Sequence, residues 1–98
     1  MKIRILPEAE RDIEEAFFFF ESRTKGLGYY FLDSITADID SLAWFGGIHR
    51  KVYNSHRLIT KRFPFAVYYK ITDEVVVVQA VLDCRRNPTW IRYRLQDI

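Results

Sequence analysis

The stretch VVVVQAVLD, residues 75–83, decides the fold because it is an almost unbroken run of β-branched and other apolar side chains. A strand that is apolar at consecutive positions must be covered on both faces, so we expect it to be the central strand of a sheet. The preceding FAVYYKI, residues 65–71, is joined to it by Thr72-Asp73-Glu74, and this spacing predicts an antiparallel hairpin.

The chain before Gly47 follows a helical period, and the chain beyond it follows the period of strands. KIRIL (2–6) predicts a short first strand, followed by a helix over 7–23 with Pro7 at its first position. TKGLG (24–28) is typical of the turn of a helical hairpin, and its second helix is predicted over 27–45.

The segment between the second helix and the hairpin of 65–83 predicts further strands, a short one over 49–54 and a longer one over 56–63. Asn87-Pro88 ends the last strand, and TWIRYRL (89–95) predicts a short closing helix. The expected architecture is an α+β fold over residues 1–98, read as a single domain. It has two layers, with a helical hairpin on a mostly antiparallel β-α-α-β-β-β sheet and a short C-terminal helix.

The composition argues against metal-dependent, secreted and membrane-spanning classes of protein. Cys84 is the only cysteine, and His49 and His56 lie seven residues apart without a ligand pattern around them, so we expect neither a metal nor another cofactor. The N-terminus lacks the apolar core of a signal peptide, and no run approaches the length of a membrane span. The expected location is therefore the cytoplasm, with no membrane partner.

Charge is divided between the two halves of the chain. Residues 1–49 hold five Lys/Arg and nine Asp/Glu (5 − 9 = −4), and residues 50–98 hold ten and four (10 − 4 = +6). This asymmetry favours an anionic partner for the second half, the alternative being a solvated basic surface. Aromatic residues are interleaved with the basic ones, as in proteins that bind unpaired bases.

The same basic groups would suit RNA cleavage by 2′-hydroxyl attack, which needs a base, an acid and charge stabilisation at phosphorus. Strand alternation over 56–63 would send Lys61 and Arg62 to opposite faces, so only one of them would line a site. The sequence leaves open which of the two it is.

Aromatic side chains are too numerous for a core of this size, with eight Phe, six Tyr and two Trp. Four consecutive Phe on the first helix cover most of its circumference, so the alternatives are a wholly internal core and an exposed surface that a partner covers. The residues assigned to such a surface are Phe18, Phe19, Trp44 and Phe45.

Four stretches in this order resemble the RelE/ParE superfamily of toxins from bacterial type II toxin–antitoxin modules, which includes plasmid stabilisation proteins. They are LPEAERDIEEA (6–16), GLGYYFLDSI (26–35), RFPFAVYYKI (62–71) and VVVVQAVLDCRRNP (75–88). The resemblance implies the same fold and an antitoxin partner, expected to be small, acidic and partly disordered, with which the toxin forms a hetero-oligomer.

The resemblance also implies two activities. RelE-like members cut mRNA on the ribosome, whereas ParE-like members poison DNA gyrase without a hydrolytic site, and fold alone does not separate them. We expect a toxin that cuts mRNA; the alternatives are a gyrase inhibitor and a degenerate toxin that acts only with its antitoxin. The catalytic assignments carried over are Lys61, Arg62, Arg85 and Tyr93, and those for binding RNA or another target are Lys51, Arg57, Arg86 and Trp90.

One position departs from the family pattern. Many relatives read LH-x-RR at the end of the last strand, and this chain has Asp83 in place of the His. Asp83 could accept a proton itself, although Arg85 beside it would lower its pKa and weaken it as a base. The other interpretation is that Asp83 orients Arg57 or Arg85 through an ion pair.

Overall fold

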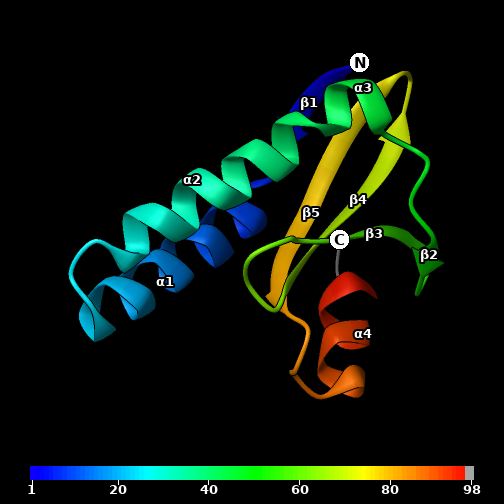
Figure 1. The fold of residues 1–98 in the computed structure, drawn as a ribbon. Coiled ribbons are helices and arrows are strands. Elements are labelled where there is room, and N and C mark those ends of the chain that lie inside the picture. The colour runs from blue at the N-terminus through cyan, green and yellow to red at the C-terminus, as the bar shows by residue number, and fades with distance from the viewer. Residues whose placement is uncertain (97–98) are drawn as a thin grey trace.

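The fold is described here for residues 1–96 in a computed structural model (Figure 1). Its elements, in chain order, are β1 (Lys2–Ile5), α1 (Pro7–Arg23), α2 (Leu27–Asp40), α3 (Leu42–Phe45), β2 (Lys51–Val52), β3 (Ser55–Ile59), β4 (Phe65–Thr72), β5 (Val75–Asp83) and α4 (Pro88–Gln96). The α+β class and the order of elements agree with the sequence-based expectation.

The five strands form one sheet in the order β1-β5-β4-β3-β2. β1 runs parallel to β5 and the other neighbours are antiparallel, so the sheet is mostly antiparallel as predicted. The middle position belongs to β4, which corrects the expectation for residues 75–83. β5 lies next to it and is covered on both faces, as its run of valines requires.

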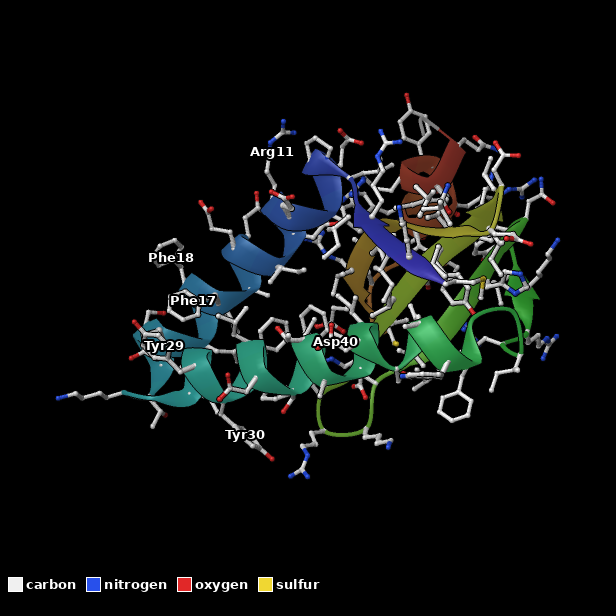
Figure 2. The ribbon with its side chains drawn as sticks, turned by 90° about the horizontal axis from the view of Figure 1, so that it is seen from above. Arg11, Phe17, Phe18, Tyr29, Tyr30 and Asp40 are labelled. Carbon is white, nitrogen blue, oxygen red and sulfur yellow. The ribbon has the colours of Figure 1, made fainter. Side chains whose placement is uncertain are left out.

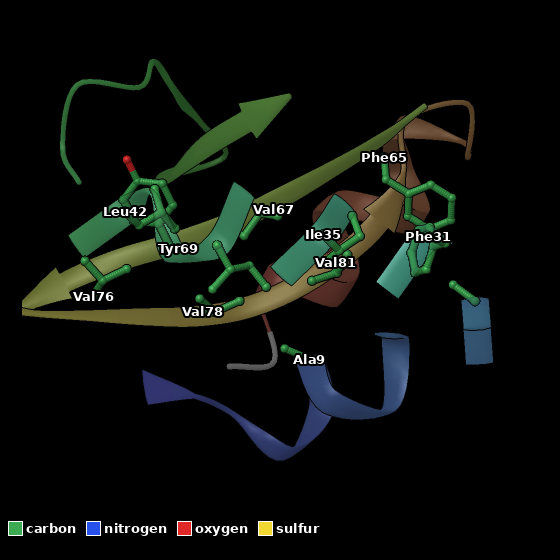
Figure 3. Close-up of a cluster of buried hydrophobic side chains, with 12 residues drawn as sticks. Ala9, Phe31, Ile35, Leu42, Phe65, Val67, Tyr69, Val76, Val78 and Val81 are labelled. Carbon is green, nitrogen blue, oxygen red and sulfur yellow. The ribbon is translucent and has the colours of Figure 1, made fainter. Parts of the chain in front are cut away.

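The sheet has two differently covered faces. The helices α1, α2 and α3 cover one face, which we call the hairpin face (Figure 3). Its buried strand residues are Phe65, Val67, Tyr69, Val76, Val78 and Val81. On the opposite side, which we call the α4 face, Ile91 and Leu95 of α4 pack on Ala66, Tyr68, Ala80 and Leu82. α4 thus adds a short third layer at one end of the sheet.

A β-bulge in β5 brings residues that are three apart onto one face. Tyr68 pairs with Ala80 and Tyr69 pairs with Val78, which leaves Gln79 as the extra residue. Gln79 is buried, and its Oε1 accepts a hydrogen bond of 2.7 Å from the buried Ser55 hydroxyl of β3. This bond satisfies the polar group that the bulge leaves inside the sheet.

Glu21 closes the helical hairpin by binding the start of α2. Its carboxylate accepts hydrogen bonds from the backbone N–H groups of Gly26 and Gly28, at 2.9 Å for the shorter bond to each. Negative charge at a helix N-terminus is favourable because the first N–H groups have no partner within the helix. A Cβ at Gly28 would lie 2.6 Å from the Phe17 carbonyl oxygen, so glycine permits the close approach of α1 and α2.

Three of the elements predicted in the middle of the chain have wrong boundaries. The predicted helix over 27–45 is divided at Ser41, whose hydroxyl binds the Asp38 carbonyl oxygen at 2.6 Å. The predicted strand over 56–63 ends at Ile59, because the Thr60 hydroxyl bonds with the carbonyls of Phe63 and Phe65 and closes a turn. The strand predicted over 49–54 is reduced to Lys51–Val52.

Two-residue turns join β2 to β3 and β4 to β5. Tyr53 and Asn54 have φ of 53° and 70°, and Asp73 and Glu74 have φ of 51° and 61°. Positive φ at both central residues matches the twist of paired strands, although the absence of glycine makes these turns strained. The turn predicted at Thr72-Asp73-Glu74 is confirmed at its last two residues.

Candidate functional site

Arg85 is held at the end of β5 by Asp83. The guanidinium donates from Nε to Oδ1 at 3.0 Å and from its terminal nitrogen to Oδ2 at 2.8 Å. The hydrogen bond from the Arg85 side chain lowers the pKa of the Asp83 carboxyl, so it is anionic and a weak base at neutral pH. The interpretation that Asp83 orients Arg85 is confirmed.

Trp90, in the first turn of α4, has the guanidinium groups of two arginines near its ring. The Arg86 guanidinium carbon is 4.1 Å from the centroid of the indole ring, and that of Arg94 is 5.9 Å from it. A guanidinium over an indole face is attracted by the ring quadrupole. Arg86 is exposed and has no carboxylate partner within residues 1–96, so it is available to an anionic partner.

Arg94 holds α4 against α1 and β5. Two of its nitrogens donate to the two carboxylate oxygens of Asp12, each at 2.8 Å, and Asp12 Oδ2 also accepts the backbone N–H of Val81 at 3.1 Å. The hydrogen bond to Asp12 raises the pKa of Arg94. The sequence-based assignment missed this pair, although Asp12 falls between Ala9 and Ala16 on the buried side of α1.

A groove of about 380 Å³ lies between α1, α4 and the end of β5. Its apolar lining includes Ala16, Phe20, Phe65, Val81 and Leu82. The arginines described above, with Trp90, belong to its charged and aromatic lining. An apolar groove with a few convergent polar groups is the usual form of a binding site.

Lys61 and Arg62 lie in the loop between β3 and β4, not on a strand, so their predicted alternation does not apply. The Lys61 backbone N–H lies 3.4 Å from an Asp38 carboxylate oxygen of α2. Arg62 donates a 2.9 Å hydrogen bond to the Tyr30 hydroxyl, also on α2. Both residues therefore face the outer helical layer; Figure 2 shows Tyr30 there.

Arg57 and Lys51 point to opposite sides of the sheet. Arg57 is paired with Tyr68, so it lies on the α4 face. Lys51 is paired with His56, whose ring stacks on Tyr69 of the hairpin face. Burial raises the pKa of the Tyr68 hydroxyl, and the interaction with Arg57 partly offsets this rise. Arg57 is the one target-binding assignment that lies beside a buried phenol.

Tyr93 projects from α4 into solvent, because Ile91 and Leu95 on either side of it point to the sheet. Within residues 1–96, no hydrogen bond or ion pair joins any two of the four catalytic assignments, which are Lys61, Arg62, Arg85 and Tyr93. Their roles remain predictions.

Within the helical layer of α1, α2 and α3, exposed aromatic residues lie in two groups at its opposite ends. Phe18 lies with Phe17 and Tyr29 near the loop of the hairpin (Figure 2), and Phe19 is half-exposed beside Arg23. We call the second group the α3 patch; its residues are Trp44, Phe45 and Ile48, and Trp44 is 85% exposed. The prediction that aromatic residues are left on the surface is confirmed. The loop between α1 and α2 lies at the opposite end of the helical layer from α3 (Figure 1).

No family model matches the chain, and no curated protein matches it in sequence. Among solved structures, its fold matches a chain described as "Chromosomal ParDE TA system from P. aeruginosa" with a TM-score of 0.72. The match covers 83% of this chain and 92% of that chain at 15% identity. The two proteins share a fold. The fold implied by the sequence resemblance is therefore confirmed.

Residues 1–96 contain neither a membrane-spanning helix nor a metal-binding cluster. No helix in this range is long and apolar enough to cross a membrane. No three His, Cys, Asp or Glu side chains in the same range are grouped so that they could hold a metal ion.

Proposed function

We propose that this chain is the toxin of a type II toxin–antitoxin pair of the RelE/ParE superfamily, and that it acts by binding its target. The observation that carries the proposal is the match of fold over 83% of the chain to a ParDE system, together with the four sequence stretches in the same order. Neither fold nor motif alone specifies an activity, so our choice between the candidate mechanisms is argued from the arrangement of side chains.

Binding without cleavage is supported by the state of the ionisable groups. A general base needs a pKa near the working pH and reach to the attacking hydroxyl. Asp83 stands where a histidine would serve, and its carboxyl is anionic and held by Arg85. His56 is stacked on Tyr69, on the face of the sheet opposite to Arg57. This arrangement favours the gyrase inhibitor among the activities that the resemblance implies.

A supercoiling assay with purified DNA gyrase tests this target. We expect the chain to inhibit supercoiling, and Arg86→Ala to require a higher concentration because Arg86 is exposed and without a carboxylate partner. Arg92→Ala is the matched control, since Arg92 is an exposed arginine on α4, the helix that follows Arg86. Normal supercoiling at a large excess of the wild-type chain would exclude gyrase.

Cleavage of mRNA on the ribosome is the second candidate. It is supported by Arg57, which lies beside the buried Tyr68 on the α4 face, where it could bind a phosphate. The same reaction would draw on the assigned groups at the end of β5 and on α4.

The proposed partner is a small acidic antitoxin that orders on binding and forms a hetero-oligomer with the toxin. The exposed aromatic residues support this, because apolar groups of this size on a surface are commonly covered by another chain. The assigned contact residues are Phe18, Phe19, Trp44 and Phe45.

Expression in a bacterial host tests the toxin assignment. We expect growth to stop on induction and to resume when a small acidic protein encoded by the adjacent reading frame is co-expressed. A chain that leaves growth unaffected at a confirmed level of folded protein would overturn the active-toxin proposal and leave the degenerate toxin.

A further inference from the structure

The segment of residues 46–50, which joins α3 to β2, is held by one buried hydroxyl. Tyr69 is fully buried in the hairpin face beside Leu42 (Figure 3). The backbone N–H of Gly47 donates to the Tyr69 hydroxyl oxygen at 2.9 Å, and His49 Nδ1 is hydrogen-bonded to the same hydroxyl. A core tyrosine thus fixes two residues of this segment.

The hydrogen-bond arrangement sets the protonation state of His49. A phenol has one hydrogen, and its oxygen here already accepts the Gly47 N–H. We assign the hydroxyl as the donor to His49 Nδ1, which then carries a lone pair, with the imidazole neutral and its proton on Nε2. A proton added to Nδ1 removes this acceptor and leaves two N–H donors facing one oxygen.

His56 holds the same segment in a way that does not depend on its charge. Its ring stacks on Tyr69, with centroids 4.9 Å apart and an interplanar angle of 20°. Its Nδ1–H donates to the His49 carbonyl oxygen at 2.7 Å. Because Nδ1 carries hydrogen in this bond in both the neutral and the cationic ring, protonation at Nε2 preserves it.

The surroundings offer no negative charge to a protonated His49. The elements packed around it (α3, β2, β3 and β4) contain no Asp or Glu, and none occurs in the whole stretch 41–72. The charged residues that follow His49 in the chain, Arg50 and Lys51, are cationic, and Lys51 is paired with His56. Burial lowers the pKa of His49, and the charge of His56 lowers it further.

We propose that His49, Tyr69 and His56 form a proton-sensitive clasp that fixes residues 46–50 and opens when His49 is protonated. The clasp is closed at a pH above the midpoint at which His49 takes up a proton, and it opens as the pH falls through that midpoint. Ile48 of the α3 patch lies within the clasped segment, and its backbone N–H bonds to the Phe45 carbonyl oxygen at 3.3 Å. Opening therefore releases one end of the α3 patch from the sheet.

The direction of the effect on stability follows from proton linkage. The unfolded chain, with a histidine near 6.5, takes up a proton at higher pH than folded His49 does. Stability from the closed clasp is thus fully present above pH 6.5 and falls as the pH drops through the folded pKa of His49.

Nuclear magnetic resonance on the whole chain between pH 8 and pH 5 tests the clasp. We expect the His49 ring to titrate below 6.5, with the Gly47 and Ile48 amide signals moving at the same midpoint. Hydrogen-exchange protection of the Gly47 amide, corrected for the intrinsic rate, should fall about fivefold to tenfold across that midpoint, as for the loss of one hydrogen bond.

Three variants distinguish the clasp from general acid unfolding. In His49→Gln, Gly47 protection should be the same at both pH values. In Tyr69→Phe, it should be low throughout. In His56→Gln, the transition should persist at a higher pH, because one positive neighbour is gone. Constant Gly47 protection while the wild-type His49 ring titrates, or an unchanged transition in His49→Gln, would overturn the proposal. Neither result depends on the toxin assignment.

Discussion

The two faces of the sheet use their polar side chains differently, and the neighbouring residues Tyr68 and Tyr69 mark the contrast. Tyr69 points into the hairpin face, where its hydroxyl fixes a connecting segment through Gly47 and His49. Tyr68 points into the α4 face, where Arg57 lies beside it. The first face is closed and organised for stability, and the second retains a cation that a ligand could reach.

The same contrast separates the three arginines that line the groove, which are Arg85, Arg86 and Arg94. Arg94 and Arg85 are paired with carboxylates, whereas Arg86 is stacked on Trp90 and has no anionic partner within residues 1–96. The arginines look equivalent in the sequence, but they differ in the structure. Arg94 holds α4 in place, whereas Arg86 is available to bind an anionic partner. This division is the basis for our proposal that the chain acts by binding its target and not by cleaving RNA.

The largest effect is expected from removing a core ring on the hairpin face. Phe31 is fully buried and its ring packs against those of Phe20, Phe63 and Phe65. Phe31→Ala should lower the free energy of unfolding by about 3–5 kcal/mol, measured by urea denaturation. Tyr29→Ala, at a position 60% exposed on the same helix, is the control and should change it far less.

A smaller loss is expected from Asp12→Ala, which tests how α4 is held. The change leaves the partly buried Arg94 and the Val81 N–H without their acceptor, at a cost of about 2–3 kcal/mol. The amides of α4 should also lose hydrogen-exchange protection. Glu14→Ala, an exposed carboxylate of α1, should leave both measurements unchanged. Equal effects of the two substitutions would contradict an anchoring role for Asp12.

The two tyrosines provide the sharpest internal comparison. Tyr69→Phe should reduce the free energy of unfolding by about 1 kcal/mol at pH 8, and by less at pH 5, where His49 protonation has already broken the hydroxyl bond. Tyr68→Phe should change the free energy of unfolding by the same amount at both pH values. Within residues 1–96, no histidine is among the groups that act on the Tyr68 hydroxyl. Matching pH profiles for the two variants would remove the distinction between the faces.

The smallest effect on stability is expected from Asp83→Asn. Its partner Arg85 has a side chain 72% exposed, and exposed ion pairs contribute little because water and salt screen them. Arg85 lowers the pKa of Asp83, so the contribution of the pair is present above pH 3.8 and is lost as the pH falls below it. Denaturation at neutral pH should not resolve the variant from wild type; a clear loss would show that the pair supports β5.

Periodicity in the sequence predicted the parts of the fold that depend on burial. The stripe from Ala9 to Phe20 placed α1, and the valines of 75–83 placed β5, because both patterns record which side chains face the core. The break of the second helix was not predictable in this way. Ile39 and Leu42 continue the apolar stripe across Ser41, and the break depends on a local hydroxyl–carbonyl bond.

The candidate site was predicted by residue type and less well by position. Arg85 and its ion pair with Asp83 were predicted from neighbouring residues, since both lie at one strand end. Lys61 and Arg62 were misplaced because Thr60 ends the strand early by bonding within the turn. The contacts of Asp12 with Arg94 and of His49 with Tyr69 join residues far apart in the chain, which a single sequence does not pair.

The central claim is that the chain arrests growth by binding its target and not by cutting RNA. Mapping of mRNA 5′ ends in arrested cells tests this claim most directly. We predict growth arrest with the same mRNA 5′ ends as in uninduced cells, because Asp83, at the position where relatives carry histidine, is an anionic carboxylate held by Arg85 and is a weak base. Arg57→Ala is the comparison variant, because Arg57 is the group that would bind phosphate if RNA were cleaved, and we expect it to leave the pattern of ends unchanged. New ends within coding regions that appear with the wild-type chain and disappear in Arg57→Ala would contradict the account and establish cleavage of RNA.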